Sequence, residues 1–391
     1  MTTIVRAHSP AHFLTLVPDM LGFTPRESLV LVPFERGRSL GAMRFDLPHD
    51  ARGGEPERNE VDRIASTCIG MVCRVSRADA FTIVVYTDGG YGDDGPQAAL
   101  AAALLSRAEA CGLRVVDALC VASDAWGSYL DADCPKGGRP LTDLGVDPAA
   151  SGPNPDQSAG AELPACDLAE REGVARALRS LGQAVRLVTD QPDRSDDGRI
   201  DPAALTAVCA LNDIPLLFET ALDWDAASLD AFDAATMIYC LARPTLRDVA
   251  LIQWCDDLAP GDRALDAQLQ WEDGDDYPAD LASRMWGEGR RPSGERLRAA
   301  LELVRRLAAL APKTDRPGPL AVCAWLSWAL GSSTHAEVYS RSALEIEREH
   351  GLAEIVLAFV MNTHLPEWAF DPDASRRPAI PSGDAGPTPA T

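Results

Sequence analysis

Lysine is almost missing from this sequence, and the shortage accompanies a large excess of acidic side chains. Only Lys136 and Lys313 are lysines, and 36 basic residues stand against 59 acidic ones, which gives a formal net charge of -23. A charge of that sign repels polyanions and favours solubility. We therefore expect no nucleic-acid partner.

Long apolar runs and closely paired cysteines are also missing. Apolar stretches such as residues 355–361 are far shorter than the roughly 20 residues that a bilayer requires, so no membrane partner is expected. The ten cysteines include no pair with the two-residue spacing of zinc or redox motifs. Early Arg6 and His8, and the break at Pro18 and Asp19, argue against a secretory signal. These absences predict a cytoplasmic protein, and no cofactor is predicted.

The composition that remains is that of an ordinary globular protein. Hydrophobic residues make up 46% and charged residues 24% of the 391 residues, a length that suits about two domains. Residues 29–34 and 40–47 are apolar runs separated by Gly37, a pattern that predicts a β-hairpin. Helices are expected over 59–77 and 96–111, and buried strands over 80–87 and 113–122. The sequence thus predicts an α/β domain over residues 1–130.

The second half of the chain shows helical periodicity almost throughout. Residues 131–164 are rich in Pro, Gly, Ser and Asp and are predicted to form a flexible loop or linker. A helical domain is expected over 165–370, and the polar, Pro-rich residues 371–391 are expected to be a disordered tail. Apolar spacing predicts helices at 168–187, 202–211, 228–241, 245–258, 294–310, 320–330, 335–350 and 352–364.

Six cysteines fall within segments of helical periodicity. A reduced cysteine in that position behaves as a small buried hydrophobe. We expect burial for this set, which comprises Cys68, Cys73, Cys209, Cys240, Cys255 and Cys323.

Three sequence blocks resemble one actinobacterial family of unknown function, DUF4192. The first holds Leu21-Gly22-Phe23 and ends in Arg44-Phe45-Asp46-Leu47-Pro48, the second runs from Trp126-Gly127-Ser128-Tyr129 to Cys134-Pro135, and the third runs from Ala324-Trp325 to the helix at residues 352–354. The resemblance covers nearly the whole chain. It implies a shared fold and no activity, since none is attached to the family.

The second block departs from the family pattern at its cysteines. Members usually carry a cysteine just after the Ser-Tyr pair and adjacent cysteines before the proline, an arrangement suited to a metal or redox site. Here Asp131 and Asp133 stand near those positions and Cys134 is alone. A single thiolate cannot form a closed tetrahedral metal site. No metal is therefore predicted at this block.

An acidic, Gly-rich loop follows the strand predicted at 80–87. Open α/β sheets bind ligands at such strand ends. However, Asp88, Asp93 and Asp94 would repel phosphate, residues 88–95 contain no Lys or Arg, and neither common phosphate-binding glycine pattern occurs. The alternatives are a hydrated cation or metal-bridged ligand and a solvated acidic turn, and the composition favours the turn.

Residues 193–201 weakly resemble a calcium-binding loop. Asp193, Ser195, Asp197 and Asp201 occupy ligand positions, and Gly198 lies at the sharp turn of that pattern. The twelfth position, which needs a bidentate glutamate, is Ala204. An acidic loop that begins a helix is the favoured interpretation.

Five further residues are candidates for a ligand or partner surface. Trp126, Ser128 and Tyr129 are expected near a strand end, where aromatic rings with polar tips suit recognition, although packing of Trp126 against the sheet is favoured. Arg26 and Glu27 precede the hairpin, and a local ion pair is favoured over a catalytic role.

The leading hypothesis from sequence is a soluble, noncatalytic binding or regulatory protein. Its partner, a protein or a small molecule, would meet the turn at Arg26 and the Trp126 region. The alternative is an enzyme that uses Asp88, Asp93 or Asp94 as acid, base or metal ligand.

Overall fold

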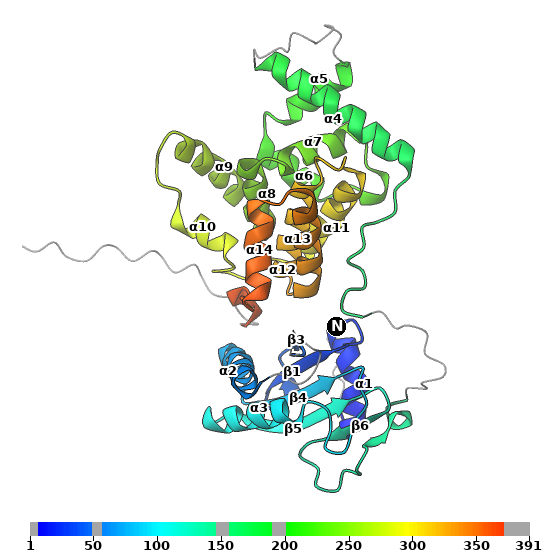
Figure 1. Ribbon diagram of the computed structural model, residues 1–391. Coiled ribbons are helices and arrows are strands. Elements are labelled where there is room, and N and C mark those ends of the chain that lie inside the picture. The colour runs from blue at the N-terminus through cyan, green and yellow to red at the C-terminus, as the bar shows by residue number, and fades with distance from the viewer. Residues whose placement is uncertain (1–6, 49–56, 146–155, 190–200, 371–391) are drawn as a thin grey trace, which may run out of the picture. The chain divides into compact units, whose positions relative to one another are not determined.

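The chain folds into an α/β unit and an all-helical unit. The computed structural model describes residues 7–48, 57–145, 156–189 and 201–370 (Figure 1). Two compact units result, residues 1–159, named here the sheet unit, and residues 160–391, named the helical unit. The predicted tail at 371–391 and most of the calcium-like loop, including Asp193, Ser195 and Asp197, lie outside the described residues.

The sheet unit is built on a mixed sheet in the order β2-β1-β4-β5-β6-β7, with β3 also paired to β1. β4 and β5 are parallel, and every other pairing is antiparallel. The predicted hairpin is confirmed, with Arg36 and Gly37 in its two-residue turn. The strands are β1 (Ser28–Glu35), β2 (Arg38–Ser39), β3 (Met43–Asp46), β4 (Ala80–Tyr86), β5 (Arg114–Val121), β6 (Ala125–Ser128) and β7 (Arg139–Pro140).

Helices cover both faces of this sheet (Figure 1). Alternate residues of a strand point to opposite faces. Leu29 and Leu31 of β1 accordingly pack with the predicted helices α2 (Arg58–Arg74) and α3 (Ala98–Ala110). Val30 and Val32 pack instead with the helix α1 (Pro10–Leu21) and the short helix η1 (Leu141–Leu144). Burial on both faces explains why β4 is apolar without alternation.

Helix α1 was not predicted from the sequence. Ser9 caps it by accepting a hydrogen bond from the His12 amide, and Pro10 occupies the first turn, where its missing N–H costs nothing. Pro18, which interrupts the apolar pattern, lies inside the helix. Leu14 and Val17 are its buried residues. The helix was not predicted because a proline within a segment, here Pro18, usually ends or kinks a helix.

The helical unit confirms the mostly α-helical second half of the chain. Its core is formed around α12, in which every residue is buried, and α8. The helices are α4 (Leu168–Val188), α5 (Pro202–Ala210), α6 (Ile214–Ala221), α7 (Ala231–Leu241), α8 (Pro244–Cys255), α9 (Leu258–Glu272), α10 (Ala279–Met285), α11 (Gly294–Leu310), α12 (Pro317–Ala329), α13 (Ser333–Ile346) and α14 (Gly351–Met361), with short turns η2 (Ala226–Ser228) and η3 (Glu367–Ala369).

A helix that crosses a bilayer must be both long and apolar. In the described ranges no single helix is both long and apolar enough to cross a membrane, whereas α5 and α6, which are bent by 98° relative to each other, pass as a pair.

The cysteine prediction is correct for four of the six positions and wrong for two. Cys68, Cys240, Cys255 and Cys323 are buried. Cys73 is exposed because it lies on the solvent-facing side of the amphipathic helix α2. Cys209 is exposed because it lies on α5, in which Ala204 is the one buried residue.

Candidate functional site

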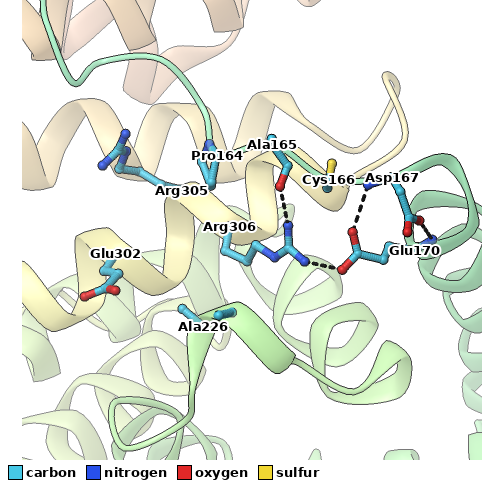
Figure 2. A pocket seen from close by; sticks show the side chains of 10 residues that line it. Pro164, Ala165, Cys166, Asp167, Glu170, Ala226, Glu302, Arg305 and Arg306 are labelled. Atoms are coloured by element: carbon cyan, nitrogen blue, oxygen red, sulfur yellow. Dashed lines mark hydrogen bonds and ion pairs between the residues drawn. The ribbon is translucent and has the colours of Figure 1, made fainter.

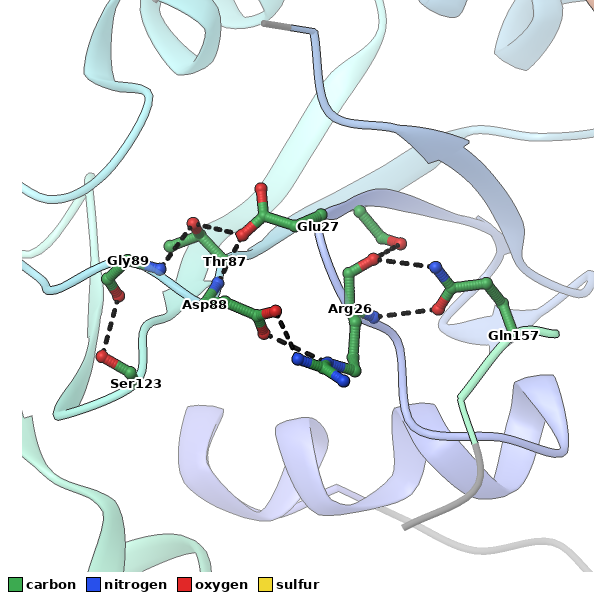
Figure 3. Close-up of polar contacts among 8 residues, drawn as sticks. Arg26, Glu27, Thr87, Asp88, Gly89, Ser123 and Gln157 are labelled. Carbon is green, nitrogen blue, oxygen red and sulfur yellow. Dashed lines mark hydrogen bonds and ion pairs between the residues drawn. The ribbon is translucent and has the colours of Figure 1, made fainter. Parts of the chain in front are cut away.

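The sheet places three sequence candidates at one edge. β4 and β5 are parallel and end at Tyr86 and Val121, and β1 runs antiparallel to β4 with Ser28 opposite Tyr86. The residues just before β1 and just after β4 therefore meet at the carboxyl ends of the parallel strands. We name this group the strand-end edge; it comprises Arg26, Glu27, Thr87 and Asp88 (Figure 3).

An exposed ion pair joins the two sides of the strand-end edge. The guanidinium of Arg26 donates to Asp88 through Nη2, at 2.6 Å, and through Nε, at 3.3 Å. The two side chains are 56% and 50% exposed. Hydrogen bonding to Asp88, followed by its charge, raises the pKa of Arg26. Solvent screens an ion pair that is this exposed, and the pair therefore contributes little to stability.

Glu27 holds the loop after β4 from a strained backbone conformation. Its φ of 42° lies in the left-handed region, which residues with a Cβ rarely occupy. One carboxylate oxygen accepts hydrogen bonds from the Thr87 hydroxyl at 2.9 Å and from the Asp88 amide at 2.5 Å (Figure 3). Strain of this kind collects at functional sites.

Gln157 closes the other side of the edge, from far along the chain. Its side-chain oxygen accepts from the Arg26 amide and its side-chain nitrogen donates to the Arg26 carbonyl, each at 3.2 Å (Figure 3). Sequence reasoning missed this contact, because residues 131–164 looked like a featureless linker. The two residues are 131 positions apart, so no local sequence pattern indicates that they meet.

In the rest of the acidic loop, one part is held by hydrogen bonds and the other part is exposed to solvent. The Gly89 carbonyl accepts from the Ser123 hydroxyl, and the Tyr91 amide donates to the Asp124 carboxylate at 2.8 Å. Asp93 and Asp94 are exposed, and neither has a polar partner among the described residues. Of the three loop aspartates, only Asp88 joins the strand-end edge.

The three candidates of the second sequence block lie in or beside β6 and have structural partners. Trp126 is 6% exposed and packs in the core on the α1 face. The Ser128 hydroxyl donates to Asp117 at 2.7 Å, and the Tyr129 hydroxyl donates to the Pro96 carbonyl. No described contact brings these side chains to the strand-end edge.

The helical unit contains a cavity that the sequence did not predict (Figure 2). Its volume is about 670 Å³, and it lies between the start of α4 and α11. Arg306 donates to the Ala165 carbonyl at 2.9 Å and to Glu170, and Arg305 donates to the Glu162 carbonyl at 2.6 Å. Both arginines thus fasten the segment before α4 onto α11. The adjacent arginines were the only sequence signal.

Metal ligands do not gather in the described part of the chain. No three His, Cys, Asp or Glu side chains there are arranged to hold an ion. Of the calcium-like loop only Asp201 is described, and its carboxylate accepts from the Ala203 amide as the N-cap of α5.

Comparison with known proteins agrees with the three sequence blocks in part. A family model described as "Domain of unknown function (DUF4192)" matches residues 10–272. The chain belongs to this family. The DUF4192 match contains the first two blocks and ends before the third, which begins at Ala324. No curated protein and no solved structure matches the chain significantly.

Proposed function

We propose that this DUF4192 protein is a noncatalytic binding or regulatory protein that recognises its partner through the strand-end edge. The observation that carries the proposal is that Arg26 and Glu27, which precede β1, meet Asp88, which follows β4, at the carboxyl ends of parallel strands. A strained Glu27 and an open Arg26–Asp88 pair are features that favour recognition over simple stability.

The partner that fits best is a protein carrying basic side chains. Asp93 and Asp94 lie exposed on the same loop without described polar partners, and the whole chain carries a net charge of -23. Complementary charge raises association rates and excludes partners of the same sign.

A catalytic role for Asp88, Asp93 and Asp94 is the second candidate. An acid–base or metal-assisted reaction needs these carboxylates to converge on one substrate. Asp88 contacts Arg26, whereas Asp93 and Asp94 face solvent, and no described contact draws the three together. We therefore propose binding in place of catalysis.

A matched pair of double variants tests the proposal. Arg26→Ala with Asp88→Ala removes the pair at the strand-end edge. Arg263→Ala with Asp280→Ala removes an equally exposed, bidentate pair in the helical unit. We expect affinity capture from extracts of the native organism, followed by mass spectrometry, to lose a specific protein only with the first variant. Equal capture by both variants and the unchanged protein would contradict the proposal.

We also propose a reducing, cytoplasmic environment. All ten cysteines are described, and each is a free thiol. Free thiols in this number fit a reducing compartment better than an oxidising one.

A further inference from the structure

Tyr91 is the anchor of the loop that carries Asp88. Its side chain is only 5% exposed, and its hydroxyl lies 3.4 Å from the Cys134 sulfur. Burial, followed by the contact with Cys134, raises the pKa of this phenol, so the hydroxyl stays protonated near neutral pH. The phenol can therefore serve as a hydrogen-bond donor to the thiol.

A second thiol lies at the same place. Cys120 on β5 is directly opposite Gly127 on β6, and its thiol donates to the Gly127 carbonyl at 3.8 Å. A Cβ added to Gly127 would overlap the Tyr91 hydroxyl and would lie 2.8 Å from the Cys134 sulfur. Opposed residues of paired strands have Cβ atoms about 5 Å apart. The phenol of Tyr91 and the thiols of Cys120 and Cys134 therefore form one cluster around Gly127.

The cluster is mechanically linked to the strand-end edge. Tyr91 follows Asp88 by three residues, and the bonds from Gly89 to Ser123 and from Tyr91 to Asp124 fasten the loop onto the β5–β6 turn. The Tyr91 hydroxyl adds a further contact that holds this loop, and the same loop carries Asp88, whose carboxylate lies opposite Arg26.

We propose that Cys134 and Cys120 are an oxidation site for hydroperoxides, and that the disulfide they form displaces Tyr91 and releases the loop at residues 87–97. Only the effect on partner binding rests on the function proposed above. In the first step a peroxide oxygen is transferred to the half-buried Cys134 sulfur, which gives a sulfenic acid and the alcohol, or water from hydrogen peroxide. In the second step the Cys120 sulfur attacks the Cys134 sulfur, the S–O bond breaks, and the oxygen leaves as water with the Cys120 proton.

The cluster also explains the order of these two steps. Cys120 is 0% exposed, so its thiol is shielded from a peroxide in the solvent. Cys134 is only half-buried, so it is the thiol that a peroxide can reach first. A disulfide brings its sulfurs to about 2 Å, and the contact of Cys134 with the phenol cannot persist unchanged.

Mass spectrometry of the full-length protein tests the chemistry. After hydrogen peroxide treatment and blocking of the remaining thiols, cleavage after Arg and Lys yields the peptide 115–136, which contains both cysteines and excludes the others. We expect this peptide to lose two hydrogens and to escape the blocking reagent. Cys120→Ser should instead accumulate sulfenic or sulfinic acid at Cys134. A fully blocked 115–136 peptide in treated protein would overturn the proposal.

Hydrogen exchange tests the release of the loop independently of any partner. We expect peptides covering residues 87–97 to exchange faster after oxidation in the native chain, and to remain unchanged in Cys134→Ser. Cys209→Ser, which removes an exposed thiol of the helical unit, is the control and should behave as the native chain does.

Tyr91→Phe adds a graded test, because loss of one hydrogen bond to the thiols should speed disulfide formation about fivefold. An unchanged rate in Tyr91→Phe, or unchanged exchange after oxidation, would refute the displacement of Tyr91. If the loop is released and partner capture stays the same, the function proposed for the strand-end edge fails instead.

Discussion

At the scale of single residues, two left-handed positions in the sheet unit contrast in what they contribute. Arg36 has a φ of 49° in the hairpin turn, where backbone geometry demands a positive φ and no side-chain function accompanies it. Glu27 has a φ of 42° and uses it to direct a carboxylate to Thr87 and Asp88. The left-handed backbone conformation is therefore required by the turn at Arg36, whereas at Glu27 it is part of a candidate site.

Substitution should separate these two roles. Arg36→Asn is expected to stabilise the sheet unit by about 0.5–1 kcal/mol, because Asn tolerates the left-handed region. Glu27→Ala should destabilise it by roughly 2 kcal/mol, since the Asp88 amide and the Thr87 hydroxyl lose their acceptor and the strain remains. Hydrogen exchange of the β1 and β4 amides under native conditions measures both changes. Equal effects at the two positions would remove the distinction.

A second residue-scale prediction concerns pH and Glu219 in the helical unit. Its carboxylate accepts from Arg296 at 2.7 and 2.9 Å and from Gln253 at 2.9 Å. The bond to Arg296 is the main cause that lowers the pKa of Glu219 below its ordinary 4.5. A carboxyl with a lowered pKa in the folded state stabilises above its unfolded pKa, and this contribution is lost as the pH falls through the lowered value.

Glu219→Gln should therefore cost roughly 2 kcal/mol at pH 7, and the difference from the native chain should shrink as the pH falls below 4.5. Urea unfolding followed by tryptophan fluorescence reports on this unit, because seven of the eight tryptophans follow residue 160. Glu302→Gln, an exposed acid without a described partner, is the control. A pH-independent difference would contradict the assignment.

At the scale of elements, the spacing of apolar residues along the sequence predicted the bounds of some helices and strands accurately. Apolar spacing predicted α11 at its observed bounds, and the run of β-branched and aromatic residues predicted β4 to within one residue. β6 was missed because its four residues are too short to show a period. α6 and α9 were missed because Pro215 and Pro260 lie in their first turns, where proline is tolerated but resembles a break.

Close packing of α12 against the end of α7 gives the element-scale prediction. A Cβ on Gly318 would lie 2.5 Å from the Leu241 carbonyl oxygen, which is backbone and cannot rotate away. Gly318→Ala should destabilise the helical unit by about 1–3 kcal/mol. Gly182→Ala in α4, where only a flexible Arg186 side chain is near, should stabilise the same unit by up to about 1 kcal/mol. Thermal melts that shift in the same direction would refute the packing argument.

At the scale of the whole molecule, sequence pattern predicted an α/β half and a helical half, and the structure describes both. Composition cannot indicate which residues meet after folding. The bond between Gln157 and Arg26 crosses 131 positions, and Cys134, which looked isolated in the sequence, shares its place with Cys120 and Tyr91. Contacts of this kind depend on strand register, and a shift of one residue would reverse the face on which Cys120 lies.

The division into units predicts that residues 1–159 fold without the rest of the chain. Every strand of the described sheet and the helices that cover both its faces lie within this range, and its two core clusters contain no residue of the helical unit. A domain with its own core can fold alone. We expect the 1–159 fragment to unfold cooperatively in urea and to give dispersed amide resonances. As a control, a fragment ending at residue 120 lacks β6 and β7, which leaves the edge of β5 unpaired, and should not fold. A 1–159 fragment with collapsed resonances and a gradual transition would show that the sheet unit depends on residues beyond its own core.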